Sequence, residues 1–129
     1  MFLQKDSLTK SEELEQILKD IEQIGDIQAS TIVSKNGLMM VSNCIESVDA
    51  NTIGAMVAML IRSATHVVKE LEKEDLEYLL IHTRSGEILV MNVCSNAILC
   101  VMTNKYEKAG LTLVEMKKAG KKIKNILGE

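Results

Sequence analysis

The sequence contains no proline and no tryptophan, and Phe2, Tyr78 and Tyr106 are its only aromatic residues. Without proline, nothing in the chain enforces a kink or a rigid linker. Without aromatic side chains, the core must be built from Ile, Leu, Val and the eight methionines, whose flexible side chains pack adaptably. A chain of 129 residues has the length of one domain, and we expect residues 1–129 to form it.

Long hydrophobic runs and excess positive charge are also missing. The longest apolar runs, Ile88–Met91 and Ala97–Met102, are far too short to span a bilayer, and the start of the chain shows no signal-peptide pattern. We therefore expect a cytoplasmic protein with no membrane partner. A net charge of −3 argues against nucleic acid as a partner. The three cysteines, Cys44, Cys94 and Cys100, are interpreted as small buried hydrophobes rather than disulfide or metal ligands.

The residues that catalysis requires form no pattern in this sequence. His66 and His82 are isolated, no glycine-rich loop has phosphate-binding spacing, and no serine stands in a G-x-S-x-G motif. Five lysines between residues 117 and 124 could form a patch for nucleic acid or an anionic membrane. A solvated helix face near a C-terminus is favoured, because no aromatic residue stands among them to stack on a base. We expect a protein that is not an enzyme and has no cofactor or metal.

Hydrophobic periodicity predicts three helices and five strands in the order αββαβββα. Thr9 and Glu12 fit a capping box at the start of the first helix, which Gly25 ends. Lys35-Asn36-Gly37 is typical of a hairpin turn between the first two strands. Three further strands are predicted over 76–83, 87–94 and 97–103, before a final helix over 108–127.

The last three strands consist largely of unbroken apolar runs, such as Ile98–Met102. A sheet with one wet face alternates apolar and polar residues, whereas continuous runs indicate that both faces are covered. The predicted fold class is therefore α+β, a five-stranded antiparallel sheet with helices on both faces.

The stretch Asp49–Glu72 predicts a long central helix with more apolar surface than one core requires. At about 100° per residue, its main apolar arc is expected to face the core; this arc comprises Ile53, Met56, Val57, Leu60, Ile61, Ala64, Val67, Val68 and Leu71. A second stripe of Ala55, Met59 and His66 is left over, with Gly54 and Ala58 small enough for close approach either to a partner or to the sheet.

A leftover apolar stripe on a long helix favours self-association. If the strand over 76–83 lies at a sheet edge, a two-fold dimer could pair this strand with its copy and pack the two central helices together. The predicted interface of this homodimer consists of Gly54, Ala55, Ala58, Met59, Arg62, His66, Tyr78, Leu80 and His82.

Three stretches in this order resemble those of a known protein family. The hairpin Ile32–Ser42 has the family's polar-Gly turn leading into an apolar strand, and the central helix carries Ala55, Ala58 and Ala64 among aliphatic residues. The stretch Ala109–Ala119 resembles the Gly-Leu opening of the family's final helix. With these three stretches the chain resembles the roadblock/dynein light chain family, and the resemblance covers nearly the whole chain, from Leu8 to Leu127.

This resemblance implies a three-layer sandwich similar to the profilin and longin folds, and a dimer joined through the second helix and third strand. It also implies a non-enzymatic regulator or platform for a small Ras-like GTPase, of the prokaryotic GTPase-companion type. No arginine finger is carried over to Arg62 or Arg84, the only arginines. Two alternatives remain open: a scaffold subunit without effect on GTP hydrolysis, and, with less support, a small-molecule sensor.

Overall fold

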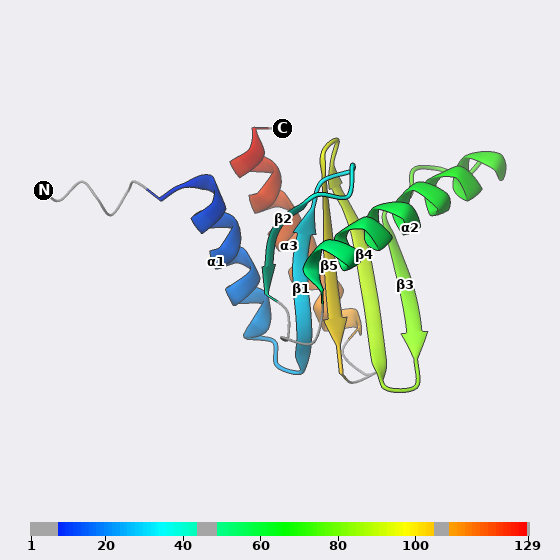
Figure 1. Cartoon of the computed structure of the whole chain (residues 1–129). Coiled ribbons are helices and arrows are strands. Elements are labelled where there is room, and N and C mark those ends of the chain that lie inside the picture. Colours follow the sequence, from blue (N-terminus) through cyan, green and yellow to red (C-terminus); the bar gives the residue numbers. More distant parts are fainter. Residues whose placement is uncertain (1–7, 44–48, 105–108, 129) are drawn as a thin grey trace, which may run out of the picture.

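A computed structural model describes residues 8–43, 49–104 and 109–128 of the chain. Within them lie three helices and five strands in the predicted order (Figure 1): α1 (Lys10–Glu22), β1 (Ile27–Val33), β2 (Met39–Asn43), α2 (Ala50–Glu70), β3 (Tyr78–Thr83), β4 (Gly86–Cys94), β5 (Ala97–Thr103) and α3 (Ala109–Leu127). The α+β fold class is confirmed. The third strand begins two residues later than predicted, and residue 108, the expected start of the last helix, lies outside the described residues.

The five strands form one antiparallel sheet in the order β2-β1-β5-β4-β3. β3 therefore lies at an edge, as the dimer prediction requires. Helices α1 and α3 cover one face of the sheet, and α2 crosses the other face diagonally (Figure 1). The continuous apolar strands thus have helices on both sides, which confirms the three layers. No helix within the described ranges has the length and apolar character needed to cross a bilayer.

Local signals place the starts of α1 and α2 where the sequence predicted them, whereas α1 ends at Glu22 with Gln23 as its C-cap, two residues before the predicted Gly25. The Glu12 backbone N–H donates to Thr9 Oγ1 at 3.1 Å, and the Thr9 N–H donates to Glu12 Oε1 at 3.0 Å, which completes the capping box of α1. The carboxylate of Asp49 caps α2 by accepting from the Asn51 N–H at 3.1 Å. Gly37 supplies the positive φ of +93° that the β1–β2 turn needs.

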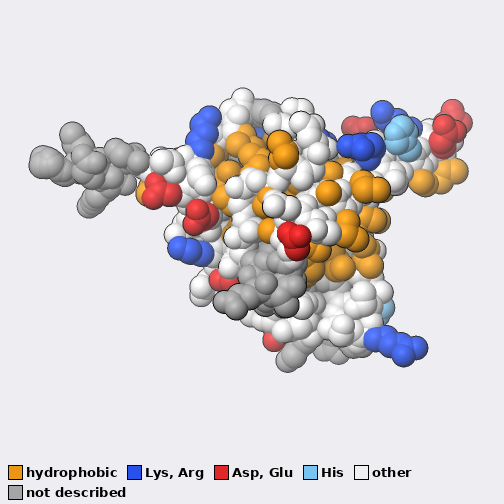
Figure 2. Space-filling model, viewed as in Figure 1, with side chains coloured by type: hydrophobic (Ala, Val, Ile, Leu, Met, Phe, Trp, Pro, Cys, Tyr) orange, Lys and Arg blue, Asp and Glu red, His pale blue; other side chains and the backbone are white. Residues whose placement is uncertain are grey.

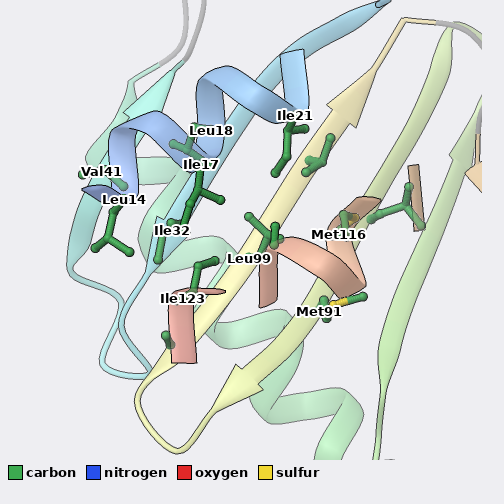
Figure 3. Close-up of a cluster of buried hydrophobic side chains, with 14 residues drawn as sticks. Leu14, Ile17, Leu18, Ile21, Ile32, Val41, Met91, Leu99, Met116 and Ile123 are labelled. Carbon is green, nitrogen blue, oxygen red and sulfur yellow. The ribbon is translucent and has the colours of Figure 1, made fainter. Parts of the chain in front are cut away.

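The main core lies between the sheet and the α1–α3 pair. Side chains from both helices point into one cluster against the sheet, with Leu99 of β5 among them (Figure 3). The cluster is almost completely shielded from solvent, with Leu18 and Leu99 exposed by 1% and 0%. Its buried members are Leu14, Ile17, Leu18, Ile21, Ile32, Val41, Leu89, Met91, Ala97, Leu99, Val101, Met116, Ala119 and Ile123.

A smaller core lies beneath α2. Val57 and Ile61 of this helix pack on Val90, Ile98 and Cys100 of the sheet. The interpretation of Cys100 as a buried hydrophobe is confirmed, whereas Cys94 is a half-buried thiol and Cys44 lies outside the described residues.

Candidate protein-interaction surface

Helix α2 extends beyond the sheet that it covers. Its N-terminal half lies over the central strands, and its C-terminal half projects past the edge strand β3 (Figure 1). A helix supported by the sheet along only part of its length leaves apolar side chains without an internal partner. The projecting half contains Val67, which is 57% exposed, and Leu71 follows directly after the helix at 63%.

The side of α2 that faces the sheet is set by two small residues. Gly54 and Ala58 are buried, and a Cβ atom built on Gly54 would lie 3.0 Å from the carbonyl oxygen of Gly37 in the β1–β2 turn. The helix therefore approaches this turn closely and turns its opposite flank toward the β3 side. The prediction that Met56, Leu60, Val67 and Leu71 face the core is wrong, because all four are exposed, the first three of them on that opposite flank.

The exposed flank of α2 continues onto the sheet. Leu79 and Ile81 of β3 are half-buried and are paired with Val90 and Ile88, which belong to the core beneath α2. Paired residues share a face of the sheet, so these two side chains lie on the α2 side. Figure 2 shows hydrophobic side chains gathered below α2 on the β3 side. We define the α2–β3 surface as Met56, Leu60, Val67, Leu71, Leu79 and Ile81.

The edge strand adds backbone groups to this surface. Among the described strands β3 pairs only with β4, so the backbone groups on its outer side have no strand partner there. Such an edge is available to another strand unless it is blunted. The apolar flank and the open edge lie next to each other, which is the geometry that strand pairing between two chains uses.

The nine predicted interface residues fall into three groups in the structure. Gly54 and Ala58 pack inside the subunit, which removes them from any contact surface. Ala55, Met59, Arg62 and His66 are exposed along a ridge of α2 on the side of the β1–β2 turn, where an Arg62 guanidinium N–H donates to the Lys35 carbonyl oxygen at 3.5 Å. Tyr78, Leu80 and His82 are exposed on β3.

The β3 group lies on the opposite face of the sheet from α2. Tyr78 and Leu80 pair with Met91 and Leu89, which belong to the α1–α3 core. The next pair in register is His82 with Glu87, whose Nδ1 and Oε2 atoms lie 3.1 Å apart. The predicted residues are thus brought near the same edge of the sheet, but not onto one continuous face.

Sequence reasoning missed the flank formed by Met56, Leu60 and Val67. The available signal was the pair of small residues, Gly54 and Ala58, four positions apart. Small residues mark the side where a helix comes closest to its neighbour, and the flank opposite to them is the one left open.

The carboxylate of Asp49 at the start of α2 is engaged in the helix cap. Hydrogen bonds from the Thr52 hydroxyl, and then from the Thr52 and Asn51 backbone, lower the pKa of Asp49 below 3.8. This carboxylate caps a helix and has a structural role. Among the residues that the structure describes, no three His, Cys, Asp or Glu side chains cluster so as to hold a metal ion.

Comparison with known sequences identifies the family. The Roadblock/LC7 domain model matches residues 13–103, which span α1 to β5. The chain belongs to the Roadblock/LC7 family. Two Methanocaldococcus jannaschii proteins, MJ1340 and MJ0310, are each 31% identical over 111 residues, covering 86% of this chain and 96% of their own length. Both carry the description "uncharacterized", so they extend the family without adding a function.

Solved structures have the same fold. Myxococcus xanthus MglB superposes with a TM-score of 0.85 at 15% identity, covering 92% of this chain and 90% of that one. An MglB structure described as having a tetrameric arrangement gives 0.81 at 13% identity, with coverages of 93% and 94%. A Roadblock/LC7 domain from Streptomyces avermitilis gives 0.81 at 16%, with coverages of 88% and 97%. At these identities the likeness establishes the roadblock fold of the chain.

Proposed function

We propose that this roadblock chain forms a cytoplasmic, non-enzymatic homodimer that binds a small Ras-like GTPase and modulates its nucleotide cycle. The family resemblance supplies the class of partner. The observation that carries the proposal is the α2–β3 surface: an apolar helix flank beside an unpaired strand edge, at the point where α2 projects past the sheet (Figures 1 and 2).

A two-fold axis beside β3 would give a partner both to the apolar flank of α2 and to the unpaired edge of β3. Antiparallel pairing of β3 with its copy would extend the sheet into the second subunit and use the open backbone groups. The projecting half of α2 would then lie over the partner subunit, where Val67 and Leu71 could be buried. Leu60 and Met56 would face the other α2 near the axis.

The predicted interface residues take different positions in this dimer. Tyr78, Leu80 and His82 contribute through strand pairing on the face opposite to α2. Ala55, Met59, Arg62 and His66 stay exposed on the ridge of α2 beside the β1–β2 turn, outside the strand pairing. We therefore propose this α2 ridge, defined by these four residues, as the place where a GTPase contacts the dimer.

The ridge offers binding groups rather than a catalytic group. Arg62 and Arg84 are the only arginines in the sequence. The Arg62 guanidinium is engaged with the Lys35 carbonyl oxygen of the β1–β2 turn. Any acceleration of GTP hydrolysis would therefore come from ordering the water-positioning and phosphate-contacting groups of the GTPase itself.

The test measures GTP hydrolysis and nucleotide exchange by purified candidate small GTPases, with and without the roadblock chain. We expect complex formation and a changed rate of hydrolysis or exchange. Arg62→Ala should weaken the complex, and Lys118→Ala, on the distant helix α3, is the control. A stable complex with both rates unchanged would favour a scaffold function over a regulatory one. The absence of any complex would contradict the proposal.

A further inference from the structure

A second surface lies on the other face of the sheet, between α3 and the β3–β4 edge. A groove of about 530 Å³ opens there, lined by residues from the lead into β3, from β4 and from one side of α3. Its apolar part comprises the half-buried Leu76 and Val93 and the buried Met91. The groove is lined by residues of a single subunit, and Tyr78 at its β3 side also belongs to the predicted dimer interface.

A glycine keeps the groove open. Gly120 lies in the middle of α3 and faces the sheet, where a Cβ atom would stand 3.9 Å from Met91 Sδ and 4.0 Å from Val93 Cγ2. Glycine is unfavourable inside a helix, and here no close approach of backbone requires it. Its effect at this position is to leave the apolar surface of β4 accessible beneath the helix.

Three lysines form one wall of the groove. Lys117, Lys121 and Lys124 are spaced at i, i+4 and i+7, so they line the same side of α3 as Gly120. None of these ammonium groups forms a salt bridge with a described residue. Lys118, on another side of the helix, is paired with Glu115 at 3.4 Å. Unpaired positive charge is thus concentrated beside an apolar floor.

The other side of the groove carries the opposite charge. Glu77 lies in the lead into β3, across from the lysine wall. A ligand that fits the groove therefore has carboxylates on the side facing α3, a central apolar stripe, and a neutral or basic side facing Glu77. The surface of a flat membrane does not present acidic, apolar and neutral or basic groups side by side in this way. A single nucleic-acid strand needs successive aromatic platforms, and Tyr78 is the one aromatic residue in the lining.

We propose that this groove binds an amphipathic helix of a protein partner, with acidic residues along the flank that faces Lys117, Lys121 and Lys124. A helix rises 1.5 Å per residue, so the lysines extend over about 10 Å, or two turns, of a helical ligand. Apolar residues at i, i+3, i+4 and i+7 of the ligand would reach Met91 and Val93, as in other helix-in-groove complexes.

The test titrates the full chain with a fluorescent peptide of about 18 residues, since shorter isolated helices are marginal in water. The peptide carries a leucine stripe with glutamate along one flank and glutamine along the other. We expect saturable binding that weakens with added salt. In spectra of the ¹⁵N-labelled protein, the amide shifts of Val93, Gly120 and Lys121 should move, whereas those of the α2 ridge should stay unchanged.

Matched variants locate the site. Lys121→Gln with Lys124→Gln should weaken binding about tenfold, and Gly120→Leu, which fills the groove, by a similar factor or more. Lys118→Gln with Lys122→Gln removes the same charge from the other side of α3 and should leave affinity unchanged. Equal loss in both double variants, no binding at millimolar peptide, or amide shifts outside the groove would overturn the proposal. So would tighter lysine-dependent binding to phosphatidylserine vesicles or to a single-stranded oligonucleotide.

Discussion

The two faces of this sheet are covered to different extents. On one face, α1 and α3 lie side by side and bury an extended cluster from Leu14 to Ile123. On the other face, α2 alone crosses the strands, and only Val57 and Ile61 of this helix are large side chains buried against the sheet. The same apolar strands therefore have a closed face and a partly open one.

This difference separates the residues that hold the subunit together from those available to another molecule. On the closed face, the apolar stripe of α1 is completely used inside the subunit, with Leu14, Ile17, Leu18 and Ile21 all buried. On the open face, α2 is oriented by the small residues Gly54 and Ala58, and its larger apolar side chains point elsewhere. We expect changes in the buried cluster of the closed face to alter folding and changes on the open face to alter association.

The largest effect is expected for Leu99→Ala on the closed face. Leu99 is fully buried, and truncating such a side chain leaves a cavity that costs about 2–5 kcal/mol of unfolding free energy. Leu60→Ala on the open face should cost less than about 1 kcal/mol within the subunit, because Leu60 is already 39% exposed. Urea denaturation of the two variants measures both values. Similar losses would show that the two faces contribute equally to folding.

The next largest effect concerns two adjacent residues on different sides of α2. Leu60 lies in the α2–β3 surface, whereas Met59, 61% exposed, lies on the α2 ridge. Leu60→Glu would place an unpaired charge in the proposed interface and should weaken dimerisation at least about tenfold, a cost of about 1.4 kcal/mol or more. Met59→Glu should leave the dimer intact and weaken GTPase binding.

Sedimentation velocity of both variants, with circular dichroism as the control for folding, decides between the two sides of α2. If Met59→Glu dissociates the dimer and Leu60→Glu does not, the interface lies on the α2 ridge, as the sequence pattern predicted. A wild-type chain that stays monomeric at high concentration would eliminate the dimer altogether.

Periodicity was sufficient to predict the order of elements and the buried stripe of α1, and a local capping motif was sufficient to predict the start of that helix. The stripe of α1 is unambiguous because its polar residues leave one apolar side, and Thr9 with Glu12 marks its start in the local sequence. These features depend on neighbours along the chain. A helix stripe and a capping box can be predicted from the sequence because residues three or four positions apart determine them.

The orientation of α2 could not be predicted in the same way. Its apolar residues extend over most of the circumference, so hydrophobicity alone does not select the side that faces the sheet. The choice depends on a contact between Gly54 and Gly37, two residues that are distant in sequence and brought together only by the fold. The groove beside Gly120 was missed for the same reason, since its floor and its lysine wall come from β4 and α3.

Two helix glycines, one on each face, allow a smaller test of the comparison. Gly120→Ala should raise the unfolding free energy by about 0.5–1 kcal/mol, because alanine is the better helix former and its Cβ would meet only ordinary contacts. Gly54→Ala should give no gain or a loss, since the new Cβ would stand 3.0 Å from the Gly37 carbonyl oxygen. Thermal unfolding of both variants measures the difference. A gain at Gly54 would show that α2 can move away from the β1–β2 turn without cost.

The smallest effect is the response of the two capped helices to acid. Hydrogen bonds from the backbone and then the hydroxyl of Thr9 lower the pKa of Glu12 below 4.5, and those from Thr52 and Asn51 lower the pKa of Asp49 below 3.8. A carboxyl group with a lowered pKa stabilises the folded state above its ordinary pKa, and this contribution is lost as the pH falls through the lowered value. Both helices should therefore weaken in acid, Glu12 beginning to contribute to the loss at the higher pH.

We expect protonation of the capping carboxylates to open the start of α2 more than the start of α1. α2 has the smaller core beneath it, so losing its Asp49 cap should open its first turns, whereas α1 stays held by its buried stripe. Hydrogen exchange below pH 3.8 should accelerate at the N-terminal amides of α2 more than at those of α1, relative to neutral pH and after correction for the intrinsic rate. Asp49→Asn keeps an acceptor but does not titrate, so it should remove the acid response from α2 alone. Equal acceleration in both helices would mean that the core beneath α2 holds it as firmly as the α1–α3 core holds α1.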